Sequence, residues 1–141
     1  MSAQDRKRVL ETLKRYTAAA TAEAKYIRES DPPEFGYIRA HLRGYIFGKY
    51  MLPEGECRSD SIAALTQASL ARMMKVTPEL AAQLDTARSC AGATSATVKK
   101  ALLFQAMERD LKIVLPAAET VAAKDVTELA RLVMRSMARN R

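Results

Sequence analysis

The chain has 141 residues, of which 48% are hydrophobic and 6% aromatic, and its formal net charge is +7. This length is enough for one domain of ordinary size with a hydrophobic core, and it is too short for two domains of that size. The longest apolar run is far shorter than a bilayer span, and the charged segment from Asp5 to Arg8 has no apolar segment after it. We therefore expect no membrane span and no signal peptide, and a cytoplasmic location.

The composition predicts an all-α fold, because Ala, Leu, Met, Arg and Lys are abundant and apolar–polar alternation is rare. A first helix is predicted over residues 3–29, where apolar residues recur at helical spacing: Val9, Leu10, Leu13, Tyr16, Ala20, Ala24 and Ile27. The sequence Asp31-Pro32-Pro33 ends this helix, since the helical conformation is disfavoured for a residue that precedes proline.

A second helix is predicted over residues 34–51, with an apolar stripe of Phe35, Ile38, Leu42, Tyr45, Ile46 and Tyr50. Gly44 and Gly48 lie one turn apart in it, and glycines inside a helix permit another helix to cross closely. The two helices make up a predicted N-terminal hairpin, residues 1–52. Its stripes must be buried either on the rest of the chain or against a second copy in a homodimer.

A turn with Pro and Gly, residues 52–59, leads to a second predicted helical unit, residues 58–141. Its first helix is expected over residues 60–74 with Asp60 or Ser59 as the N-cap, and a short helix over residues 78–87. A central helix ends near Lys112, and a loop then follows Pro116. The sequence Asp125-x-x-Glu128 predicts a capping box for a final helix with a buried stripe of Val126, Leu129, Ala130, Val133 and Met137.

The candidate site lies where the central helix begins, at Gly92-Ala93-Thr94-Ser95. Gly92 permits a tight turn, and Thr94 or Ser95 can cap the first free amides of the helix. The following apolar residues recur at helical spacing: Val98, Leu102, Leu103, Met107 and Leu111. A hydroxyl at a helix N-terminus is well placed for a phosphate ester, because the helix dipole is positive there; the alternative role is a simple cap.

Residues 60–138 resemble an acyl carrier protein domain. Leu115-Pro116, Val126 and Val133 occupy the spacings of that family's Ile-Pro sequence, the start of its last helix and the last apolar residue of that helix. The segment from Leu70 to Leu80 resembles the end of the family's first helix and the loop after it. The resemblance implies an acyl-carrier-protein-like helical bundle to which the N-terminal hairpin has been added.

The resemblance also implies an attachment site. The family has a Gly-x-Asp-Ser motif whose serine carries 4'-phosphopantetheine. When residues are counted forward from Val76, the segment from Gly92 to Ser95 aligns with this motif. The resemblance therefore implies that Gly92, Thr94 and Ser95 are the counterparts of the motif residues. Counted back from Pro116, Thr97 takes the place of the serine. Thr94 stands where the family has Asp, and Ala96 where it has a large aliphatic residue. An Asp-Ser-Ile sequence also occurs at Asp60-Ser61-Ile62, where no glycine precedes it and a helix cap is expected.

Two functions follow from these patterns. The first is a non-standard acyl or aminoacyl carrier that holds its cargo as a thioester on 4'-phosphopantetheine at Ser95, and its partners would be a phosphopantetheinyl transferase and acyl-loading or acyl-accepting enzymes. The second is an unmodified carrier-fold adaptor that binds a protein partner through its basic face, the stripe of Arg131, Arg135, Arg139 and Arg141. Lys99 and Lys100 favour the second, because the family's second helix is typically acidic.

Other functional classes find little support in the sequence. Cys57, Cys90 and His41 lack the spacing of a metal site, so no metal is expected. No phosphate-binding loop, nucleophile elbow or catalytic acid pair occurs, so we expect no enzyme activity. Aromatic residues are not interleaved with the arginines, and nucleic acid is therefore not the expected partner.

Overall fold

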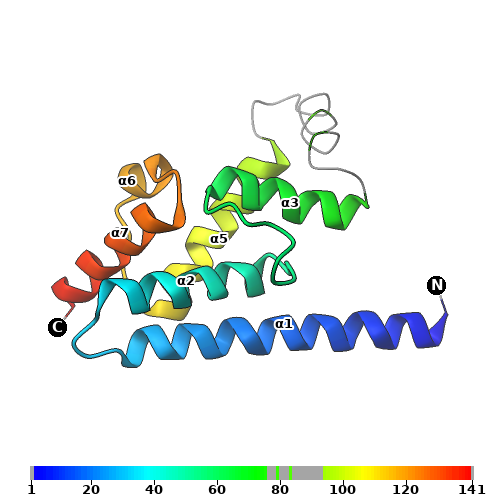
Figure 1. Ribbon diagram of the computed structural model, residues 1–141, viewed down its shortest axis with the longest axis horizontal. Coiled ribbons are helices and arrows are strands. Elements are labelled where there is room, and N and C mark those ends of the chain that lie inside the picture. The colour runs from blue at the N-terminus through cyan, green and yellow to red at the C-terminus, as the bar shows by residue number, and fades with distance from the viewer. Residues whose placement is uncertain (1, 76–78, 80–82, 84–93, 141) are drawn as a thin grey trace.

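A computed structural model describes residues 2–75, 79, 83 and 94–140 of the chain. This part is all-α, as predicted, with six helices that pack around one main hydrophobic core (Figure 1). Within these ranges no strand is formed, and the only β-type pairing is an isolated bridge between Ser61 and Asp125. Of the short helix predicted over residues 78–87, all residues but Glu79 and Gln83 lie outside the described part of the chain.

The first two helices, α1 (Ala3–Glu29) and α2 (Phe35–Lys49), form the predicted hairpin. α1 begins at the predicted residue because Ser2 and Asp5 make a reciprocal capping box. The close crossing predicted from the glycines is confirmed at Gly48, where a Cβ atom would lie 2.9 Å from the backbone nitrogen of Ala20. The two backbones approach there to a distance that only glycine allows.

Only the second half of α1 is buried. Ala20, Ala24 and Ile27 lie in the core, whereas Leu10 is 56% exposed and Val9 and Leu13 are also exposed. Figure 1 shows why, since the N-terminal end of α1 extends beyond the end of α2. The first half of the predicted apolar stripe therefore has no cover within the described residues.

The hairpin packs on the C-terminal helices, so the rest of the chain buries its stripes apart from the first half of α1. α2 lies against α7, and the end of α1 lies against α5. Arg28 of α1 donates a hydrogen bond of 2.6 Å to the backbone oxygen of Asp110. The shared core includes fully buried side chains from both parts of the chain: Ile27, Ile38, Leu42, Tyr45, Ile46, Leu65, Met107, Leu129 and Val133.

Helix α3 (Ile62–Met74) has Ser61 as its N-cap, so the expectation of Asp60 or Ser59 was wrong. The hydroxyl of Ser61 accepts a hydrogen bond of 3.2 Å from the amide of Ala64. Asp60 is used differently, because its carboxylate pairs with Arg39 and with the Nε atom of Arg43 at 2.8 Å. Two arginines of α2 thus form ion pairs with Asp60, the residue that precedes the N-cap Ser61.

The C-terminal helices are α5 (Ser95–Leu111), α6 (Ala117–Ala122) and α7 (Val126–Arg139). α6 replaces the predicted loop: Pro116 is its N-cap residue, and the Thr120 hydroxyl donates a hydrogen bond of 2.6 Å to the Pro116 carbonyl. The buried stripe predicted for α7 is confirmed: Val126, Leu129, Ala130, Val133 and Met137.

The start of α7 differs slightly from the predicted capping box. Asp125 accepts the amide of Glu128 at 2.8 Å as expected, but the Glu128 carboxylate accepts the amide of Lys124 at 2.6 Å. Lys124 also accepts a hydrogen bond of 2.9 Å from the amide of Ile62. The starts of α3 and α7 are therefore tied together by backbone hydrogen bonds.

Candidate functional site

The predicted site residues lie at the first turn of α5. Thr94 is the N-cap, and its hydroxyl accepts a hydrogen bond of 3.1 Å from the amide of Thr97. Ser95 is the first helical residue, and it is exposed. Thr94 therefore caps the helix, and the Ser95 side chain is accessible to an enzyme that would modify it. Gly92 lies outside the described residues.

Thr97, which the second count places at the attachment position, is also exposed. Its hydroxyl lies 3.0 Å from the Thr94 hydroxyl, so the two side chains share a hydrogen bond at the cap. The first turn thus carries three hydroxyl groups in four residues. Those of Thr94 and Thr97 hold the cap together.

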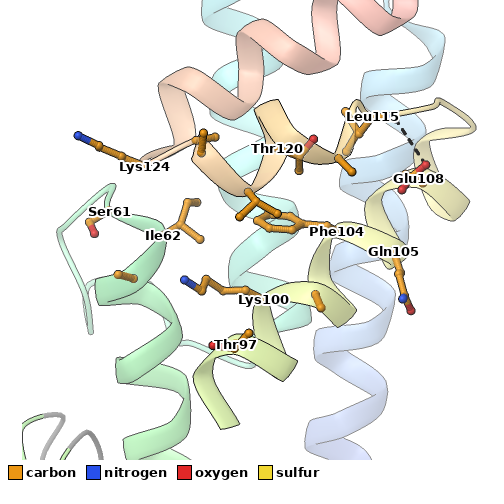
Figure 2. A pocket seen from close by; sticks show the side chains of 16 residues that line it. Ser61, Ile62, Thr97, Lys100, Phe104, Gln105, Glu108, Leu115, Thr120 and Lys124 are labelled. Carbon is orange, nitrogen blue, oxygen red and sulfur yellow. Dashed lines mark hydrogen bonds between the residues drawn. The ribbon is translucent and has the colours of Figure 1, made fainter. Parts of the chain in front are cut away.

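A groove with a volume of about 790 Å³ lies beside this turn, between α5, α6 and the start of α3 (Figure 2). One face of α5 supplies its largest wall, through residues at helical spacing: Thr97, Lys100, Ala101, Phe104, Gln105 and Glu108. Ile62, Leu115 and Val121 add apolar surface from the other elements. The volume is in the range of small-molecule sites, roughly 300–1,000 Å³.

Charges are distributed unevenly along the groove. Lys100 reaches from α5 towards α3, and Lys124 lies on the same side, next to the start of α3 (Figure 2). Glu108 lies at the opposite end, where its carboxylate accepts a hydrogen bond of 3.4 Å from the amide of Leu115. Throughout the described ranges, neither lysine side chain forms an ion pair or a hydrogen bond. The groove therefore has a positive end and a negative end.

Lys99 faces a different direction from Lys100. Its Nζ atom lies 3.4 Å from the sulfur of Met73 and 5.2 Å from the centre of the Tyr50 ring. Burial in this apolar contact lowers the pKa of Lys99. Of the Lys99-Lys100 pair, only Lys100 belongs to the groove.

The apolar pattern of α5 is buried only in part. Leu103, Met107 and Leu111 are buried, but Leu102 is 59% exposed, and Val98 is exposed as well. Helical spacing alone does not make all five buried, because α5 packs on α3 and α1 through the face of Leu103 and Met107. Val98 and Leu102 fall on the neighbouring face.

The basic face of α7 is partly engaged within the chain. Arg135 pairs with Glu119 at 3.3 Å, and the guanidinium group of Arg131 lies 5.7 Å from the centre of the Phe35 ring. Arg131, Arg135 and Arg139 are all exposed. Arg141 lies outside the described residues. The face is open to solvent, but two of its arginines already have intramolecular contacts.

The remaining candidate residues are Cys57, Cys90 and His41. Cys57 is a half-buried free thiol, and Cys90 lies outside the described residues. The Nδ1 atom of His41 lies 2.5 Å from a carboxylate oxygen of Glu23, and its ring packs beside Tyr37. Among the residues that can be described, no three His, Cys, Asp or Glu side chains gather as metal ligands. In the same part of the chain, every helix is too short or too polar to cross a bilayer.

Comparisons with models of protein families, with curated proteins and with solved structures found no match for this chain. The assignment of a function therefore depends on the residues and the geometry described above. Of these, sequence reasoning found the helix start at Thr94-Ser95 but missed the groove. The sequence signal for the groove was a small residue, Ala101, followed three positions later by an aromatic residue, Phe104. Both lie on α5 beside the buried face of Leu103.

Proposed function

We propose that the chain is a non-standard acyl or aminoacyl carrier, which holds its cargo as a thioester on a 4'-phosphopantetheine arm at Ser95. The observation that carries the proposal is the position of Ser95, which is exposed and lies two residues before Thr97, the first α5 residue of the groove. An arm attached there would begin beside an apolar groove. The chain itself would perform no catalysis, and we expect it to act in the cytoplasm.

The residues around Ser95 fit the attachment of such an arm. Its Oγ atom would form the phosphate ester at the N-terminal end of a 17-residue helix, where the helix dipole stabilises negative charge. The hydrogen bond from the Thr97 amide to Thr94 fixes the turn that presents the serine. When attached, the arm would supply the terminal thiol that forms the thioester with the cargo.

The groove would protect an apolar cargo from water. Ile62 and Leu115 are buried and Phe104 is half-buried, so the inner wall of the groove is apolar. Burial of an acyl chain there is favourable by about 0.8 kcal/mol for each methylene group removed from water. The resemblance of residues 60–138 to acyl carrier proteins supports the same proposal, and it implies a phosphopantetheinyl transferase and acyl-transferring enzymes as partners.

Intact mass spectrometry tests the proposal. Protein purified from its own host, or co-expressed with a transferase of broad specificity, should gain the mass of one 4'-phosphopantetheine. The Ser95→Ala variant should lose this addition, and Thr97→Ala should keep it. The reverse pattern would move the attachment point to Thr97. An unmodified wild-type chain, beside a positive control carrier that is modified, would contradict the proposal.

A second function, an unmodified adaptor for a protein partner, is favoured by one observation. The first half of α1 exposes Val9, Leu10 and Leu13 with no cover in the described residues, and Arg6 and Lys7 lie on the same segment. Partner binding that survives Ser95→Ala but is lost when Leu10 and Leu13 are changed to Asp would support an adaptor that uses this face of α1. Loss of binding when Arg131 and Arg135 are changed to Glu would support an adaptor that uses the basic face of α7. Loss of binding on Ser95→Ala would support the carrier.

A further inference from the structure

We propose that the groove between α3, α5 and α6 binds a linear carboxylic acid, with the carboxylate at Lys100 and the apolar tail along Phe104. This inference names a ligand class for the groove of the proposed function. It rests on the proposed function only for the assignment of the groove as a binding site for an apolar chain. Binding of the free acid itself needs no arm at Ser95.

Lys100 is the main reason for the carboxylate. Its side chain is half-buried, and it crosses from α5 towards Ile62 at the start of α3 (Figure 2). No carboxylate of the described residues pairs with it. A cation beside an apolar wall is partly desolvated, so an anionic ligand group that pairs with it forms a strong, charge-assisted hydrogen bond.

The neighbours of Lys100 set the orientation of the ligand. Lys124 lies at the same end of the groove, where its exposed side chain points outwards and adds positive charge (Figure 2), and the Ser61 hydroxyl, which accepts the Ala64 amide, still has its own proton to donate. Glu108 lies at the other end of the groove and would repel a carboxylate there. The carboxylate therefore belongs at the α3 end, and the tail runs towards Leu115.

The shape of the groove favours an unbranched tail. Phe104 and Leu115 provide apolar surface, and much of the remaining lining is alanine: Ala63, Ala101, Ala117, Ala122 and Ala123. Val121, at the rim of the groove, is 76% exposed and would be covered by a bound chain. A slender apolar ligand can lie along such small side chains and still contact the larger ones.

Isothermal titration calorimetry of the full, unmodified chain tests the inference with two probes of equal length, decanoate and decan-1-ol. Decanoate should bind at least about 10-fold more tightly, since a hydrogen bond to a charged group contributes about 10-fold or more. Lys100→Met should remove this preference and change decanol binding by less than about 3-fold. Lys14→Met, a change of an exposed lysine on α1, is the matched control and should leave both affinities unchanged.

A second variant checks that both probes occupy the groove. Ala101 is exposed on the α5 wall, so Ala101→Trp should fill the groove without disturbing the core, and it should weaken both probes at least about 10-fold. Equal affinities for the acid and the alcohol, no effect of Lys100→Met, or no binding of either probe would overturn the inference.

The two proposals fail in different ways. A chain that gains an arm at Ser95 but does not bind decanoate is a carrier for another cargo. A chain that binds decanoate and is never modified has the ligand site without the carrier function. A decanoyl thioester of a small thiol distinguishes a site for the free acid from a site for a thioester-linked acyl chain, because the thioester carries no charge. If it binds the wild type as tightly as decanoate does, the carboxylate contributes nothing to binding, which contradicts the inference.

Discussion

The hydroxyl of Tyr45 on α2 donates a hydrogen bond of 2.7 Å to the carboxylate of Asp110, near the end of α5. Lys49 and Arg109 reach the same carboxylate at 3.2 Å and 2.9 Å. Burial raises the pKa of Tyr45 well above its usual range, with the Asp110 hydrogen bond as the second cause. This cluster joins the N-terminal hairpin to the helices that carry the candidate site.

Loss of the Tyr45 hydroxyl should therefore weaken the attachment of the hairpin. Tyr45→Phe should lower the free energy of unfolding by about 1 kcal/mol, the usual net contribution of such a hydrogen bond. Urea unfolding monitored by circular dichroism measures this change. In a double-mutant cycle, Tyr45→Phe should cost clearly less when Asp110 is already Ala, which has no acceptor for the hydroxyl. Additive effects of the two changes would contradict the importance of the contact.

The same cluster predicts a loss of stability in acid. Burial alone would raise the pKa of Asp110, but hydrogen bonds from Arg109, Tyr45 and Lys49 lower it to about 2. An unfolded Asp titrates near a pKa of about 3.9, so between about pH 4 and pH 2 the unfolded state binds more protons, and stability falls as the pH falls. Urea unfolding of the wild type and Asp110→Asn at several pH values measures the effect. The advantage of the wild type should be largest above about pH 4 and should shrink towards pH 2.

The close crossing of α1 and α2 predicts that alanine substitutions at Gly44 and Gly48 will lower the stability of the fold by different amounts. A Cβ atom at position 48 would meet the backbone of Ala20, whereas at position 44 it would meet the flexible carboxylate end of Glu23, at 2.8 Å. Gly48→Ala should destabilise the protein by about 1–3 kcal/mol, because the backbones must separate. Gly44→Ala should cost less, since the Glu23 side chain can move and alanine favours the helix by about 1 kcal/mol. Thermal unfolding of both variants makes the comparison, and equal costs would contradict it.

The two halves of α1 should respond differently to truncation of their apolar side chains. Ile27→Ala should cost about 2–5 kcal/mol, because Ile27 is fully buried in the core. Leu13→Ala should change the free energy of unfolding by no more than about 0.5 kcal/mol, because Leu13 is exposed. These values apply to dilute protein. A large effect of Leu13→Ala that depends on protein concentration would instead indicate a second copy on this face.

The helix boundaries could be predicted where the signal is local. α1 begins at Ala3 because Ser2 and Asp5 cap each other, and α7 begins at Val126 because Asp125 accepts the amide of Glu128. Such pairs lie three residues apart in the sequence and need no tertiary partner. The fold class followed from composition and helical spacing for the same reason.

The groove and the partial exposure of α5 could not be predicted in this way. Spacing shows which residues share a helix face, but it does not show which face another helix covers. Val98 and Leu102 have the spacing of core residues, and yet α5 buries the face of Leu103. The groove also requires α6, whereas the sequence after Pro116 predicts a loop. The position of Ser95 at a helix start was predictable, but the apolar surface beside it was not.

The overhang of α1 affects how the size of the particle is measured in solution. A helix of 27 residues is about 40 Å long, and its first half extends past the end of α2 (Figure 1). An elongated monomer has more hydrodynamic drag than a sphere of equal mass, so it elutes early in gel filtration. A monomer of 15.6 kDa with this overhang will therefore elute earlier than a compact globular protein of equal mass, and a column calibrated with such standards will overestimate its mass. Light scattering or sedimentation equilibrium, which measure mass independently of shape, will report the correct subunit number.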